Sequence, residues 1–221
     1  MSTPSERNLL EFDLSRGTRA REAPTVAVLL HGRGSDKGDL QGLRPLLPAD
    51  WTLVTPRAPF PGAPWSYGPG YAWYRYLEED RVATETLEES LGLLDDFLNE
   101  LPQVIGAPPG RVVLGGFSQG GTMSLAYALS RPQAVAAAIN FSGFLAASVD
   151  LDDTGSAPPR TPIFWGHGTG DPAIPFALAE RGRNRLRRAG AQLVTRDYPI
   201  GHWIAPEEVA EAVAMVEENL E

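Results

Sequence analysis

The chain has 221 residues, three histidines, no cysteine and a formal net charge of −9. Its length fits one large domain or two small ones. The missing cysteine excludes a disulfide framework, a thiolate nucleophile and a cysteine-ligated metal site. The acidic charge balance argues against a nucleic-acid partner, because nucleic-acid-binding proteins carry basic surfaces.

Short apolar segments alternate along the chain with longer segments that have helical spacing. The sequence predicts strands at 9–14, 26–30, 51–55, 111–116, 136–141, 162–166 and 192–198. It predicts helices at 84–101, 119–129, 176–189 and 206–220. Such alternation favours the α/β class, with a mostly parallel central sheet and helices on both faces. We expect residues 1–221 to form a single domain without a large cap domain.

The sequence shows neither a signal peptide nor a membrane span. The N-terminus is polar, and no uninterrupted apolar run approaches the ~18 residues that suggest a transmembrane helix. We therefore expect a cytoplasmic protein without a stable membrane anchor.

The predicted helix at 176–189 is rich in arginine. It contains Arg181, Arg183, Arg185, Arg187 and Arg188. A run of like charges on a helix is usually a solvated face, so we expect these side chains to lie in water.

A G-x-S-x-G motif, Gly116-Phe117-Ser118-Gln119-Gly120, lies between a predicted strand and a predicted helix. A sharp turn from strand to helix presents the serine hydroxyl at the carboxyl edge of the sheet. This context indicates a nucleophilic serine at Ser118. The alternative is a glycine-rich turn that only starts a helix.

A serine nucleophile needs a base, which is usually a histidine. In this architecture the base follows the serine in the chain, and only His167 and His202 follow Ser118. His202 comes just after the predicted strand at 192–198, where a base can reach the serine. His167 is the alternative base.

The histidine needs a carboxylate that orients it. Asp171 follows the predicted strand at 162–166 after a short glycine-rich turn, so it is the predicted acid. The competing carboxylates are Asp150, Asp152, Asp153 and Asp197.

The oxyanion of the reaction needs two hydrogen-bond donors. One predicted donor is the backbone N–H of Gln119, directly after the nucleophile. The other is the backbone N–H of Arg33, because Gly32 and Gly34 free this loop to turn its amides inward. We expect His31 to pack beneath the loop.

Four blocks of the sequence carry a resemblance to a known family. They are Leu30-His31-Gly32-Arg33-Gly34, Gly115-Gly116-Phe117-Ser118-Gln119-Gly120-Gly121, His167-Gly168-Thr169-Gly170-Asp171-Pro172-Ala173-Ile174-Pro175 and Gly201-His202. Together they resemble the phospholipase/carboxylesterase family of α/β-hydrolases, which includes acyl-protein thioesterase-like enzymes and small bacterial carboxylesterases.

The resemblance implies an α/β-hydrolase fold with Ser118 as nucleophile, Asp171 as acid and His202 as base. It also implies backbone donors at Arg33 and Gln119. Arg33 departs from the family, which often has an apolar residue there. Its guanidinium either favours an acidic group on the substrate or points to solvent.

The aromatic residues between 57 and 80 are the remaining candidates for a substrate site. We predict substrate contacts for Trp65, Tyr67, Trp73, Tyr74 and the later Trp203. Aromatic rings among prolines and glycines can wall an apolar acyl site. The alternative is a loop that packs itself onto the sheet.

The sequence thus predicts a serine hydrolase that cleaves carboxylic esters or thioesters through an acyl-enzyme. No metal or organic cofactor is expected, the partner is a small ester or acyl thioester, and the chain is compatible with a homodimer. The same triad could act on another acyl bond, in a lysophospholipid, lactone or peptide. A non-catalytic binding protein on this fold is a further alternative. A metal-dependent hydrolase would need His31, His167 and His202 to converge.

Overall fold

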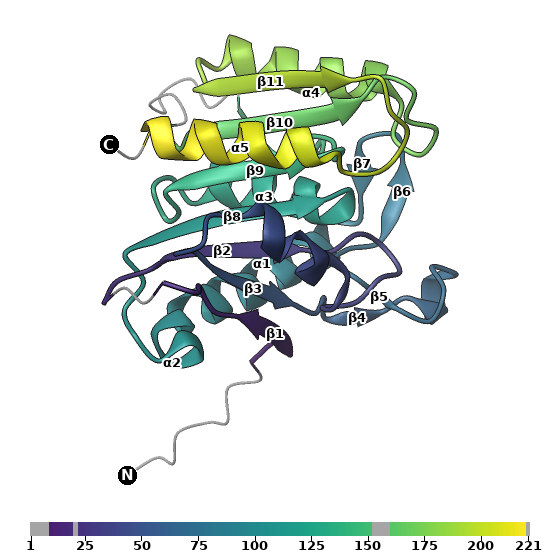
Figure 1. Cartoon of the computed structure of the whole chain (residues 1–221). Helices are drawn as coiled ribbons and strands as arrows, with labels where there is room; N and C mark the ends of the chain where they lie inside the picture. The colour runs from purple at the N-terminus through teal and green to yellow at the C-terminus, as the bar shows by residue number, and fades with distance from the viewer. Residues whose placement is uncertain (1–8, 20–21, 152–159, 220–221) are drawn as a thin grey trace.

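The computed structural model describes residues 9–19, 22–151 and 160–219. Its centre is a seven-stranded sheet in the order β1-β3-β2-β8-β9-β10-β11 (Figure 1). The strands are β1 (Phe12–Ser15), β2 (Thr25–Leu30), β3 (Thr52–Pro56), β8 (Arg111–Phe117), β9 (Ala137–Phe141), β10 (Ile163–Gly168) and β11 (Leu193–Tyr198). Only the β1–β3 pair is antiparallel among these neighbours. The prediction of a mostly parallel sheet is confirmed.

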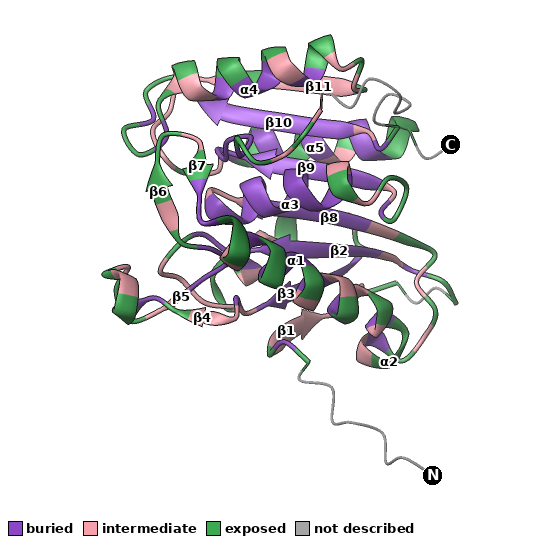
Figure 2. Ribbon diagram, turned by 180° about the vertical axis from the view of Figure 1, so that it is seen from behind, coloured by how far each residue is buried: buried purple, intermediate pink, exposed green. Residues whose placement is uncertain are grey.

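Helices cover both faces of this sheet. They are α1 (Thr84–Asn99), α2 (Leu101–Ile105), α3 (Gln119–Ser130), α4 (Phe176–Arg188), α5 (Pro206–Asn219) and the 3₁₀ helix η1 (Asp39–Leu46). Helix α5 lies in front of the sheet in Figure 1, whereas α1, α2 and α3 lie in front in the reverse view of Figure 2. The segment predicted as one helix at 84–101 is divided in the structure, because α1 ends at Asn99 and α2 begins at Leu101.

Strand β2 shows why a central strand of this sheet is a continuous apolar run. Val26, Val28 and Leu30 pack in the core beneath α1 and α3, while Ala27 and Leu29 pack in the core beneath α5. Successive side chains of a strand point to opposite faces, so a strand covered on both faces buries all of them. Figure 2 shows the central strands buried.

The aromatic segment between β3 and β8 forms two small hairpins. Its elements are β4 (Phe60–Pro61), the 3₁₀ helix η2 (Ala63–Trp65), β5 (Tyr71–Ala72), β6 (Tyr76–Glu78) and β7 (Arg81–Val82). Strand β4 pairs with β5, and β6 pairs with β7. Within the described residues, no large cap covers the sheet, and no helix is long and apolar enough to cross a membrane.

Two strands differ from their predicted bounds by more than one residue. The first begins at Phe12 rather than at residue 9. Strand β10 continues beyond residue 166, because His167 and Gly168 still pair with Asp197 and Tyr198 of β11. His167 therefore lies within a strand and not in the loop after it.

The prediction that α4 exposes all its arginines to water is wrong. Arg183 is 3% exposed and donates to Asp197 Oδ1 at 2.5 Å. It also donates to the carbonyl oxygens of Trp165 at 2.9 Å and Arg196 at 3.0 Å. Because α4 packs on β10 and β11, one side of the helix is buried, and a long arginine there needs polar partners.

Candidate active site

The candidate catalytic residues all follow the carboxyl ends of parallel strands. Arg33 comes after β2, Ser118 after β8, Asp171 after β10 and His202 after β11. These strands run in the same direction within one sheet, so their carboxyl ends meet at one edge. Residues distant in the sequence converge there.

Ser118 lies at a tight turn between β8 and α3. Its φ of 55° and ψ of −114° are rare for a residue with a side chain. A Cβ on Gly116 would overlap the backbone of Gly120, and a Cβ on Gly120 would overlap the Leu30 carbonyl. The backbone N–H of Ser118 donates to the Phe141 carbonyl at 2.8 Å. Close backbone packing therefore holds the strained conformation that presents the hydroxyl.

His202 lies between Ser118 and Asp171. Its Nε2 is 2.9 Å from Ser118 Oγ, and its Nδ1 is 2.6 Å from Asp171 Oδ2. The second oxygen of Asp171 accepts the backbone N–H groups of Ala173 at 2.8 Å and Ile174 at 2.9 Å. When Nδ1–H donates to the carboxylate, Nε2 is free to accept the serine proton. The structure thus brings together the three residues that the sequence singled out.

The Asp171 carboxylate and the His202 ring differ in their access to solvent. The Asp171 side chain is fully buried, whereas 21% of the His202 side chain is exposed. Phe117 packs on the His202 ring with centroids 4.7 Å apart. A buried carboxylate next to a partly exposed ring suits a base that contacts substrate.

His31 is buried beneath the loop after β2. Its Nδ1 is 2.8 Å from the Gly32 carbonyl oxygen, and its Nε2 is 3.0 Å from the backbone N of Ala58. These contacts indicate that Nδ1–H donates and Nε2 accepts. Burial lowers the pKa of His31, so the ring is neutral.

The competing base His167 and the competing acid Asp197 form hydrogen bonds with groups other than Ser118 and His202. His167 is fully buried, and its Nε2 lies 2.9 Å from the Ile174 carbonyl oxygen. Asp197 pairs with Arg183. Asp150 precedes the undescribed segment 152–159, and Asp152 and Asp153 lie outside the described residues. In the part of the chain that the structure describes, no group of three or more His, Cys, Asp or Glu side chains could hold a metal ion.

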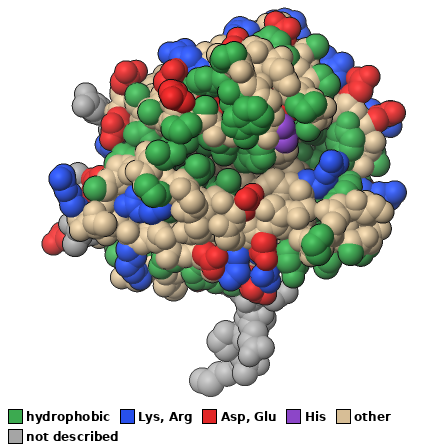
Figure 3. Space-filling view, turned by 45° about the vertical axis from the view of Figure 1, so that its right-hand side comes forward, with side chains coloured by type: hydrophobic (Ala, Val, Ile, Leu, Met, Phe, Trp, Pro, Cys, Tyr) green, Lys and Arg blue, Asp and Glu red, His purple; other side chains and the backbone are tan. Residues whose placement is uncertain are grey.

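A cavity of about 710 Å³ opens beside Ser118 and His202. Its apolar wall is formed by Tyr74, Tyr76, Phe117, Phe144, Ile174 and Leu178. Arg33 and Gln119, the predicted oxyanion donors, also line it. In Figure 3 a histidine is visible at the surface among hydrophobic side chains, with Lys or Arg side chains nearby. An apolar cavity with a few polar groups at one end suits an acyl group.

The predicted aromatic contacts are distributed over several places. Tyr74 lines the cavity. Trp73 is fully buried in the core, which contradicts a direct contact with substrate. Trp65 and Tyr67 lie against each other with centroids 5.8 Å apart and do not line the cavity. Trp203 is 56% exposed and lines a second hollow, which His202 also lines.

Several wall residues were not among the predicted substrate contacts. Tyr76 lies in the second hairpin, Phe144 follows β9, and Leu178 lies in α4. These segments meet only through the tertiary structure. A search for apolar residues just after each predicted strand would have found Phe144.

The Arg33 side chain is held by aromatic rings at the cavity. Its guanidinium carbon lies 4.8 Å from the centroid of the Tyr67 ring and 5.9 Å from that of Tyr76. No carboxylate of the described residues forms an ion pair with it. Arg181, which also lines the cavity, pairs with Glu79 at 3.1 Å and Asp80 at 3.0 Å.

The comparison with known proteins agrees with this geometry. Residues 17–220 match the model of the phospholipase/carboxylesterase family. Acyl-protein thioesterase 1 of Eremothecium gossypii is 29% identical over 92% of this chain and 91% of its own length. The protein of the same name from Cryptococcus neoformans is 30% identical over 80% of this chain and 79% of its own length.

Solved structures agree as well. Esterase PE8 is 30% identical, has a TM-score of 0.78 and covers 95% of this chain and 99% of its own. Acyl-protein thioesterase 2 of Zea mays shares the fold with a TM-score of 0.79, at 22% identity, over 96% of this chain and 99% of its own. The α/β-hydrolase fold implied by the resemblance is confirmed. The chain belongs to the phospholipase/carboxylesterase family.

Proposed function

We propose that this chain is a single-domain serine hydrolase that cleaves carboxylic esters or thioesters through an acyl-enzyme. The observation that carries the proposal is the position of His202, hydrogen-bonded to Ser118 at 2.9 Å and to Asp171 at 2.6 Å. These residues lie at a cavity with an apolar wall. Membership of the family, with relatives named as thioesterases and esterases, supports the same class of bond.

In the first half of the reaction, Ser118 Oγ attacks the carbonyl carbon while His202 Nε2 takes the hydroxyl proton. Asp171 orients the ring and stabilises its cation. The backbone N–H groups of Arg33 and Gln119 donate to the oxyanion, and such a donor contributes about 3 kcal/mol in serine hydrolases. His202 then protonates the leaving alcohol or thiol.

In the second half, water replaces the alcohol or thiol. His202 takes a proton from the water as it attacks the acyl carbon, and Ser118 regains its proton when the free acid leaves. Asp171 keeps its carboxylate throughout. These steps involve no metal or organic cofactor.

Other acyl bonds are the second candidate, because the same three residues could attack a lysophospholipid, lactone or peptide. A binding protein without catalysis receives less support, since such a protein has no need of a serine, a histidine and an aspartate hydrogen-bonded in series. A cytoplasmic location and a homodimer stay predictions from the sequence.

The test is Ser118→Ala with p-nitrophenyl esters. We expect turnover to fall by about a thousandfold or more, with an unchanged circular dichroism spectrum. Ser130→Ala, at the far end of α3, is the matched control and should keep its activity. A fluorophosphonate should label the wild type and not Ser118→Ala. Undiminished turnover by Ser118→Ala would disprove the proposal.

A panel of esters graded by acyl length, run beside an acyl thioester, then separates the substrate classes. Preference for short esters indicates a general carboxylesterase. Preference for long chains or thioesters indicates a lipid or acyl-protein substrate.

A further inference from the structure

Trp73 contacts both segments that supply the proposed oxyanion donors. Its indole Nε1–H donates to the His31 carbonyl oxygen at 3.0 Å. Its backbone N–H donates to the Gln119 side-chain Oε1 at 2.8 Å. His31 begins the loop that contains Arg33, and Gln119 is itself the other proposed donor. One residue therefore joins the two halves of the oxyanion hole.

On the first side, hydrogen bonds fix the peptide that carries the Arg33 N–H. That N–H and the Gly32 carbonyl belong to one planar peptide unit, so they cannot turn independently. The Gly32 carbonyl accepts the Nδ1–H of His31 at 2.8 Å, and the other ring nitrogen accepts the Ala58 N–H at 3.0 Å. Trp73 holds the main chain of the same histidine. The direction of the Arg33 N–H thus depends on the Trp73–His31 contact.

On the second side, the Gln119 carboxamide is fully engaged. Its Oε1 accepts the Trp73 N–H, and its Nε2 donates to the Tyr74 carbonyl at 2.7 Å. The residue is 4% exposed and is the first residue of α3. Its own backbone N–H lies in the first turn, where helix N–H groups have no partner within the helix. The side-chain hydrogen bonds therefore fix the residue that supplies the second proposed donor.

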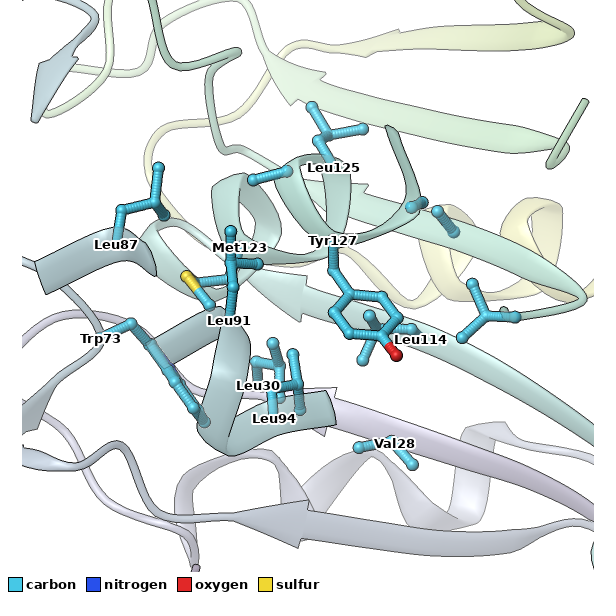
Figure 4. Packing of buried hydrophobic residues seen from close by; sticks show 14 of the residues in the cluster. Val28, Leu30, Trp73, Leu87, Leu91, Leu94, Leu114, Met123, Leu125 and Tyr127 are labelled. Atoms are coloured by element: carbon cyan, nitrogen blue, oxygen red, sulfur yellow. The ribbon is translucent and has the colours of Figure 1, made fainter. Parts of the chain in front are cut away.

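Trp73 itself is held rigidly and at a distance from the substrate. It is fully buried, its carbonyl accepts a hydrogen bond from Ser90 Oγ, and it does not line the cavity. Figure 4 shows its indole in the core near Leu30 and Leu94. Its ring centroid is 5.6 Å from that of His31. Such a residue acts through its neighbours, not on the reacting atoms.

We propose that Trp73 is a positioning residue for the oxyanion hole, which it keeps in register by bonding to both of its segments. The inference rests on the proposed acyl transfer by Ser118. Donors stabilise the oxyanion only when they lie about 2.7–3.1 Å from it. A small shift of either segment therefore weakens the binding of the transition state more than the binding of the substrate.

The test is Trp73→Phe, which keeps an aromatic ring and removes the indole N–H. We expect kcat for a p-nitrophenyl ester to fall about 10- to 100-fold, with KM changed less than about threefold. The midpoint of the pH–rate profile should not move, because the bonds among Ser118, His202 and Asp171 are untouched. Affinity for a trifluoromethyl ketone, which forms a tetrahedral oxyanion on the serine, should fall in proportion to kcat/KM.

Trp165→Phe is the matched control. Trp165 is also fully buried, but its indole Nε1 has no hydrogen-bond partner in the described structure, so this variant removes ring volume without removing a bond. Trp165→Phe should lose about as much stability as Trp73→Phe, but its kcat should stay close to that of wild type. A loss in Trp73→Phe no larger than in Trp165→Phe, or one confined to KM, overturns the inference. The proposed function stands or falls separately, on Ser118→Ala.

Discussion

The ring of His167 lies directly behind Asp171, with its Nε2 3.7 Å from Asp171 Oδ2. The same nitrogen is 2.9 Å from the Ile174 carbonyl oxygen, and the Ile174 N–H donates to Asp171 Oδ1 at 2.9 Å. Burial lowers the pKa of His167, so the ring is neutral and Nε2–H donates to that carbonyl. His167 therefore holds the turn that holds Asp171.

The two histidines near Asp171 should differ sharply when substituted. We expect His202→Ala to lower kcat by about a thousandfold or more, because it removes the proposed base. His167→Asn should lower kcat only about tenfold while reducing the free energy of unfolding by about 1–3 kcal/mol, because a buried hydrogen bond is lost. Ester kinetics and urea denaturation measure both effects. Equal losses of kcat would make His167 a candidate base again.

Glu208 predicts an unusual dependence of stability on pH. Its side chain is fully buried against Gly166, its Oε2 accepts the Ala205 N–H at 3.3 Å, and burial raises its pKa from 4.5 to about 7. Between these values the unfolded chain has released this proton and the folded chain has not. The free energy of unfolding should therefore fall as pH rises through this window, by about 3 kcal/mol in total from this group.

Denaturation of wild type and Glu208→Gln at pH 5 and pH 8 tests this. The glutamine cannot ionise, so the free energy of unfolding of Glu208→Gln should fall much less between pH 5 and pH 8 than that of wild type. The lowered pKa values of His31 and His167 act in the opposite direction, since their stabilisation is lost as pH falls below 6.5. Both histidines remain in both proteins, so the difference between them isolates Glu208. Parallel pH profiles would contradict the prediction.

Arg183 should contribute more to stability than the exposed arginines of the same helix. Arg183→Met removes the hydrogen bonds to Asp197 and to two backbone carbonyls, and leaves the buried Trp165 carbonyl without this donor. We expect the free energy of unfolding to fall by about 2–4 kcal/mol. Arg188→Met, at an exposed position of α4, is the control and should stay within about 0.5 kcal/mol of wild type. Equally small changes in the free energy of unfolding for both variants would mean that the Arg183 contacts contribute no more to stability than a solvated side chain.

Arg33 should favour esters whose acyl chain ends in a carboxylate. Arg33 lines the cavity, and its guanidinium lies near the rings of Tyr67 and Tyr76. Charge-assisted hydrogen bonds to a carboxylate are strong. Asp39 and Glu79 also line the cavity and oppose an anion, so we expect only about a tenfold effect. The measurement is the ratio of kcat/KM for p-nitrophenyl hydrogen glutarate to that for its methyl ester. Arg33→Gln and high salt should each lower this ratio. An unchanged ratio in Arg33→Gln would mean that the guanidinium points to solvent and does not contact the substrate carboxylate.

Local patterns were sufficient for much of this molecule. Continuous apolar runs such as 26–30 indicate strands buried on both faces, and the strand–glycine–serine–glycine–helix order around Ser118 indicates a tight turn. Chain order and position after a strand then selected His202 and Asp171, because parallel strands end at one edge of the sheet. The structure brings all three side chains together.

Other features required the tertiary structure. Nothing near Arg183 in the chain identifies its hydrogen-bond partners on β10 and β11, and nothing near Trp73 indicates its bonds to His31 and Gln119. The cavity wall likewise combines Tyr76, Phe144 and Leu178 from three separate segments. Periodicity reports which face of an element is buried, whereas the partner of a buried polar group depends on segments that folding brings together. Packing therefore decided which aromatic residues line the cavity and which lie buried behind it.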